Sequence, residues 1–173
     1  MSRKRQTLQE QTQWVALCGL LVALMLVLGF VESLMPVAAG VPGIKLGLSN
    51  GVLIFAVYML NIPTAFVLMV LKVVLSGLLF GGVNAMMYAF AGGLVSMVFM
   101  TLLSRVRGVH PVMVSMVGGV AHNVGQVALA MVILSTPSLM YYMAVLMVAG
   151  LITGAVTGVA ANLVMKHLQK IRR

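Results

Sequence analysis

The sequence predicts an all-α integral membrane protein, a bundle of six transmembrane helices with both termini in the cytoplasm. Three observations predict this class: a mean hydropathy of +1.14, a charged fraction of 8%, and long apolar runs separated by glycine, proline and asparagine. An ordinary soluble domain has about 25% charged residues. A chain of 173 residues this apolar has too little polar surface to cover a fold in water, so lipid is the expected solvent.

Six apolar runs define the expected spans, because about 20 helical residues cross a hydrocarbon core of roughly 30 Å. The runs cover residues 14–35, 46–61, 63–82, 84–104, 111–135 and 139–166. Breakers separate them: Pro36 with Pro42, Asn61 with Pro63, Gly81 with Gly82, Gly108 with Pro111, and Pro137. The first run is longer than the core of a signal peptide, so we expect a retained helix. Residues 14–166 then form the transmembrane domain, between basic cytoplasmic segments at 1–13 and 167–173.

Charge predicts the orientation of the spans. Nine of the eleven Lys and Arg residues lie in three clusters, at 3–5, 105–107 and 166–173. Six crossings with a cytoplasmic N-terminus place all three clusters inside, as the positive-inside rule requires. We therefore expect a multi-pass protein of a bacterial cell membrane. Because the clusters flank apolar runs, they indicate topology and contact with membrane lipid, and we expect no nucleic-acid partner.

The second run is short, because only about 15 residues separate Leu46 from Leu60. Either its helix begins near Pro42, or it begins at Gly47 and the stretch PGIKLG enters the membrane as irregular backbone lining a cavity. In both cases Lys45 lies near free N–H groups at a helix start, an arrangement that suits a carboxylate or phosphate.

Three charged side chains fall at membrane depth: Glu32, Lys45 and Lys72. Such residues are costly and are functional candidates by default. One negative and two positive charges cannot all be neutralised by pairing within the protein. Either one lysine gives up its proton, or an anion from outside the protein balances it. Alternatively, Glu32 and Lys45 form an ion pair that only clamps the outer loop.

The fifth run carries the polar stretch GGVAHNVGQ, residues 118–126, in which His122 and Gln126 share a helix face. Buried polar groups need partners, so this face should point into the bundle. The expected solute-binding residues are Glu32, Lys45, Asn50, Lys72, Asn84, His122, Asn123, Gln126 and Tyr141. The alternatives are bonds between helices for the fifth run and interfacial anchoring for Tyr141 and Tyr142.

Small residues recur at four-residue spacing on two runs. Gly150, Gly154 and Gly158 do so on the last, and Gly19 with Ala23 on the first. This spacing lets helices approach closely, and we expect internal packing for the last run. For the first run, docking to a separate membrane subunit is an equal alternative.

The stretches GFVESLMP, VPGIKLGLSN, YAFAGGLVSM and GGVAHNVGQ resemble the bacterial membrane family called heptaprenyl diphosphate synthase component I, or the Gx transporter family. The resemblance covers about 14–166. That family is similar in turn to the S components of energy-coupling factor (ECF) transporters. The likeness implies six helices, a solute site near the outer face, and a small-residue stripe on the first helix that docks onto an ECF transmembrane scaffold with its ATPase subunits. Here that stripe would be Ala16, Gly19 and Ala23.

The enzyme named in the family label needs oxygen ligands for magnesium, and prenyl diphosphate synthases supply them from aspartate-rich motifs. This chain has no aspartate, and its acidic residues are Glu10 and Glu32. We therefore expect no catalytic site, no metal and no cofactor. The lone Cys18 can form no disulfide within one chain. The chain also has no Walker motif, so ATP-driven work would need a partner.

Three functions follow from these observations. The first is the substrate-binding membrane subunit of a small-molecule importer, for a polar or anionic metabolite or an isoprenoid or quinone precursor. The second is a non-catalytic membrane component of heptaprenyl diphosphate or quinone synthesis. The third is a membrane anchor of a redox complex. An importer needs Lys45, His122 and Gln126 at one cavity, whereas an anchor needs only its helix surfaces.

Overall fold

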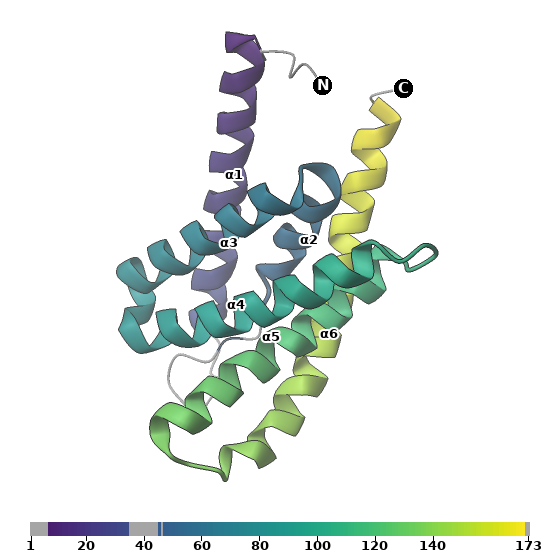
Figure 1. The fold of residues 1–173 in the computed structure, drawn as a ribbon. Helices are drawn as coiled ribbons and strands as arrows, with labels where there is room; N and C mark the ends of the chain where they lie inside the picture. The colour runs from purple at the N-terminus through teal and green to yellow at the C-terminus, as the bar shows by residue number, and fades with distance from the viewer. Residues whose placement is uncertain (1–6, 35–44, 46, 172–173) are drawn as a thin grey trace.

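The computed structural model describes residues 7–34, 45 and 47–171, which are helical apart from the connections (Figure 1). The α-helices are α1 (Leu8–Ser33), α2 (Asn50–Met59), α3 (Ile62–Ser76), α4 (Gly82–Ser104), α5 (Pro111–Leu134) and α6 (Leu139–Ile171). A short π-helix, η2 (Gly77–Gly81), joins α3 to α4. The predicted all-helical class is confirmed for the part of the chain described.

Four helical stretches are long and apolar enough to cross a membrane. They are Leu8–Ser33, Ile62–Ser104, Pro111–Leu134 and Leu139–Lys170. The protein is therefore a multi-pass membrane protein. The stretch Ile62–Ser104 is not one straight rod, because α3 and α4 run side by side in opposite directions and η2 turns the chain between them (Figure 1). Gly82 follows that turn with φ +73°, a backbone conformation that favours glycine.

The expected second span, 46–61, departs most from prediction. Its helix α2 has 10 residues and covers about 15 Å, half of a hydrocarbon core of roughly 30 Å. A helix beginning near Pro42 is wrong, because Lys45 is not helical and Gly47 has φ +86°. A turn at Leu48 and Ser49 leads into α2. Residues 42–44 and Leu46, which belong to the predicted irregular stretch, lie outside the described residues.

Glycines bring α5 and α6 together, and these helices form the most extensive pair in the fold. The backbones of Gly119 and Gly150 meet, leaving no room for a side chain on either. Gly154 and Gly158 lie on the α5 backbone in the same way, next to Ser115. The predicted internal packing of the small residues on the last run is confirmed.

Two long helices extend beyond their predicted bounds. α1 begins at Leu8 instead of 14, since Thr7 and Glu10 cap it with a reciprocal pair of hydrogen bonds. α6 continues to Ile171 instead of 166. Side chains also cap the starts of α3 and α5: Asn61 accepts a hydrogen bond from the N–H of Thr64, and His110 accepts one from the N–H of Val112.

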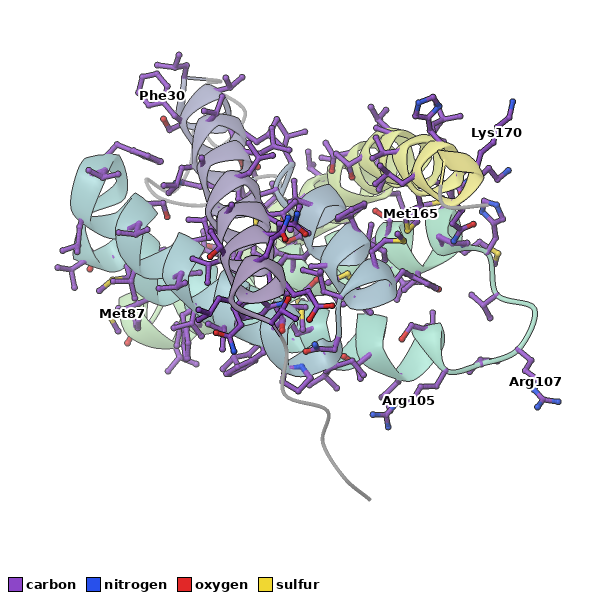
Figure 2. The ribbon with its side chains drawn as sticks, turned by 90° about the horizontal axis from the view of Figure 1, so that it is seen from above. Phe30, Met87, Arg105, Arg107, Met165 and Lys170 are labelled. Carbon is purple, nitrogen blue, oxygen red and sulfur yellow. The ribbon has the colours of Figure 1, made fainter. Side chains whose placement is uncertain are left out.

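The arrangement places α2 at the centre, between α1, α3 and α6, with α1 crossing α3 steeply (Figure 1). The start of α1 and the end of α6 lie at the same end of the molecule. Seen from above, Arg105, Arg107 and Lys170 lie toward one side, and Phe30 and Met87 lie toward the other (Figure 2). Six of the nine predicted site residues lie near the point where α1 ends and α2 begins: Glu32, Lys45, Asn50, Lys72, His122 and Gln126.

Candidate functional site

Glu32 ends the buried face of α1 and is 4% exposed. Its Oε1 accepts a hydrogen bond from the N–H of Gly47 and a longer one, 3.4 Å, from the N–H of Leu48. These are the amides that precede α2, where the sequence predicted a place for a carboxylate or phosphate. The carboxylate that accepts hydrogen bonds from these amides therefore belongs to the protein itself. Its other oxygen, Oε2, is buried and has no hydrogen-bond partner among the described residues.

Gln126 fixes the backbone of Lys45. The N–H of Lys45 donates to Oε1 of Gln126 at 3.0 Å, and Nε2 of Gln126 donates to the carbonyl of Lys45 at 2.9 Å. Gln126 is fully buried on α5, so both bonds form away from solvent. A primary amide suits this task because it carries a donor and an acceptor side by side. Gln126 thereby holds a non-helical stretch of chain against α5.

The Lys45 side chain turns toward an aromatic pair. Its Nζ lies 4.7 Å from the centre of the Phe80 ring, within cation–π range. Phe80 in turn packs edge-on against Phe30, with ring centres 5.6 Å apart. Sequence reasoning missed both rings, since a phenylalanine within an apolar run carries no signal that separates it from core. The π-helix η2 carries Phe80 to this position.

Lys72 enters the same region from α3 and is 3% exposed. Its Cε lies 3.9 Å from the position that a Cβ on Gly29 would take, and the tip of Phe80 lies equally near that point. Gly29 lies about one helical turn before Glu32 on α1, and the Phe80 ring also lies against the Lys45 ammonium. Two lysines and one carboxylate, predicted from three separate runs, are therefore brought together.

His122 and Asn50 complete this group, with 2% and 1% of their surfaces exposed. Both approach Gly47: a Cβ there would lie 2.8 Å from Nδ2 of Asn50 and 3.2 Å from Cδ2 of His122. Nδ2 of Asn50 and both ring nitrogens of His122 lack hydrogen bonds of ordinary geometry among the described residues, although Nδ1 lies close to the backbone of Gly92. We call Glu32, Lys45, Asn50, Lys72 and His122 the buried polar cluster.

An unpaired buried donor or acceptor costs about 1–3 kcal/mol. The buried polar cluster holds several such atoms together with an excess of one formal positive charge. Two ammonium groups, an amide donor and an imidazole are groups that can bind an anion, and Glu32 is the one carboxylate among them.

Asn123 has another role. Its Nδ2 donates to the carbonyl of Leu146 at 2.6 Å and ties α5 to α6. For Asn123, the alternative role considered from the sequence, a hydrogen bond between helices, is therefore the one observed. It does not hold for Gln126, whose partner is the stretch before α2.

Two predicted site residues lie outside the buried polar cluster. Asn84 is exposed near the start of α4, and Tyr141 is 81% exposed near the start of α6. A polar residue at a helix end can face either the surface or the interior, and a single sequence does not distinguish these two orientations.

The small-residue stripe of α1 faces outward. Ala16, Gly19 and Ala23 are exposed, and no described atom lies within 4 Å of a Cβ placed on Gly19. The opposite face carries the buried residues Leu21, Met25, Gly29 and Glu32. The stripe thus has no partner within the described part of this chain.

Within the described ranges, no group of three or more His, Cys, Asp or Glu side chains is placed to hold a metal ion. Cys18 is a free, half-buried thiol on α1.

Comparison with known proteins gives one match. A family model described as heptaprenyl diphosphate synthase component I matches residues 21–164, most of the chain and all of the buried polar cluster. Neither the curated proteins nor the solved structures contain a match.

Proposed function

This chain belongs to the heptaprenyl diphosphate synthase component I family, and we propose that it is the solute-binding membrane subunit of a small-molecule importer. The observation that carries the proposal is the buried polar cluster. It gathers costly charges from α1, α3 and the stretch before α2 at membrane depth, with buried hydrogen-bonding atoms left unpaired.

In this proposal the two lysines hold the anionic group of the solute. Lys72 reaches it from α3 and Lys45 from the stretch that Gln126 fixes. Asn50 donates from its free Nδ2, and His122 adds a hydrogen bond from the side of α5. Glu32 holds the turn at Gly47 and Leu48 and offsets one of the two positive charges. The chain carries out no chemical step, since it has no aspartate and only one glutamate at the site.

The proposed topology has six crossings, both termini in the cytoplasm and the site toward the outer face of a bacterial cell membrane. Two observations support it: the shared end of α1 and α6, and the hairpin of α3 with α4. In this arrangement the 10 residues of α2 cross only about half of the bilayer.

An importer needs an energy source, and we propose that it comes from a partner. The outward stripe of Ala16, Gly19 and Ala23 supports docking to a membrane scaffold that carries ATPase subunits, as in ECF transporters. Small residues let another helix approach closely, and Gly19 has open space above it.

A second candidate function is a non-catalytic membrane component of heptaprenyl diphosphate synthesis. The family description favours it, since a component I implies a second component. The outward stripe on α1 would then bind that synthase component instead of a transporter scaffold.

Purification of the protein from its own membranes under mild conditions tests the two functions. The importer predicts co-purification with a membrane scaffold and ATPases, and uptake of the retained solute that depends on ATP. Gly19→Leu should abolish both, whereas Ala144→Leu, which enlarges an exposed small residue on helix α6, should abolish neither. Co-purification with a prenyl diphosphate synthase, and no retained solute, would reject the importer in favour of the second function.

A further inference from the structure

An apolar cavity of about 270 Å³ lies between α1, α2 and α6. Its walls include Leu21, Leu28, Leu48, Phe55, Val156 and Val164. Ligand pockets usually measure roughly 300–1,000 Å³, so this cavity has room for a small apolar group. None of the residues of the buried polar cluster lines it.

The cavity and the buried polar cluster meet at Leu48. The side chain of Leu48 lines the cavity, while its N–H donates to Glu32. On α1, Leu28 lines the cavity one turn before Glu32, and the wall continues to Leu21, about 10 Å further along the helix. The apolar space therefore leads away from the buried polar cluster along α1.

The charge of the buried polar cluster limits what it can hold. Two lysines face one carboxylate, and the other acidic residue of the chain, Glu10, caps the distant start of α1. The formal sum is one positive charge. Uncompensated charge at membrane depth is expensive, so a single negative charge on the ligand gives the best balance. A phosphate monoester, with about 1.5 to 2 negative charges, would leave an excess.

The charge and the cavity together define a class of ligand. Building on the proposed function, we propose that the solute is a monoanionic amphiphile, a carboxylic acid with an apolar body. Its carboxylate lies between Lys45 and Lys72, and its apolar body lies in the cavity between α1, α2 and α6. Leu48 lies at the junction between the carboxylate and the apolar body of this ligand.

Three probes in protein-containing lipid nanodiscs test the head and the body separately: decanoate, decyl phosphate with the same chain, and acetate with the same head. Protein-free discs correct for uptake into lipid. We expect saturable binding of decanoate, with decyl phosphate and acetate each at least about tenfold weaker. Ala160→Leu, at an exposed position that lines the cavity, should weaken decanoate about tenfold or more. The matched control is Ala144→Leu, exposed on α6 outside the cavity, which should leave decanoate binding unchanged.

Glu32→Gln tests the charge balance in the same discs. Gln keeps an oxygen acceptor for the amides of Gly47 and Leu48 but raises the formal charge from one to two. The preference should move from decanoate toward decyl phosphate by about tenfold. An unchanged preference overturns the monoanion inference.

Other outcomes separate this inference from the proposed function. The amphiphile inference is overturned if acetate binds as tightly as decanoate, or if Ala160→Leu and Ala144→Leu bind decanoate equally well. Either result leaves the proposal of an ATP-dependent importer, for another solute, intact. Decanoate binding that Lys72→Gln leaves unchanged places the probe elsewhere and overturns the inference as well. The co-purification experiment decides the importer independently, because it uses no probe.

Discussion

Replacing Gln126 with methionine tests whether the fixed backbone of Lys45 serves solute binding. Methionine matches the shape of glutamine but removes both hydrogen bonds to Lys45, of 3.0 and 2.9 Å. Bonds within membrane proteins contribute about 0.6 kcal/mol on average and up to about 1.7. Two of them give about 1–3 kcal/mol. If that energy positions Lys45, Gln126→Met should weaken solute affinity about 5- to 150-fold.

The matched control is Asn123→Leu, because Asn123 is an equally buried amide on α5. Its bond goes to Leu146 on α6, away from Lys45. Both variants should lose stability against denaturing detergent, whereas only Gln126→Met should lose affinity in equilibrium binding of the retained solute. Equal losses of affinity in the two variants would refute a positioning role for Gln126.

Two further predictions concern glycines. Gly47→Ala should lower the free energy of unfolding by more than about 1–2 kcal/mol, the strain of a positive φ, because the new Cβ also approaches Asn50 and His122. Denaturation beside Gly82→Ala, which also has a positive φ but open space around the new Cβ, tests the contact. A smaller loss in Gly47→Ala than in Gly82→Ala would contradict it. Gly19→Leu should leave the free energy of unfolding of the isolated protein within about 0.5 kcal/mol of wild type, since no described atom lies within 4 Å of a Cβ on Gly19. A large loss of stability on denaturation would show that the stripe packs within this chain.

The all-helical membrane class and much of the site could be predicted because lipid makes the sequence easy to interpret. Charged residues in an apolar run must be buried or solvated, so Glu32 and Lys72 stood out, and the structure buries both. The amides of the fifth run were expected inside for the same reason. Their separate tasks were not predictable, since neighbouring Asn123 and Gln126 bond to elements that are far apart in sequence.

The start of α2 was not predictable from composition. Leu48 and Ser49 continue the apolar run in the sequence. In the structure they form a turn after Gly47, whose φ is positive, and α2 begins at Asn50. Amides able to bind a carboxylate were correctly expected before that helix. The carboxylate that they bind is Glu32, and a single sequence could not pair Glu32 with Gly47, 15 residues further along the chain. The capping of α1 by Thr7 and Glu10 follows a known spacing and could have been predicted.

The central claim is that the buried polar cluster holds a small anion. Native mass spectrometry of protein extracted from its own membranes tests this most directly, with wild type, Lys72→Gln and Asn123→Leu measured side by side. We predict a retained small anion on wild type and on Asn123→Leu, and none on Lys72→Gln. An anion that persists on Lys72→Gln, or no bound small molecule on wild type, would contradict the claim.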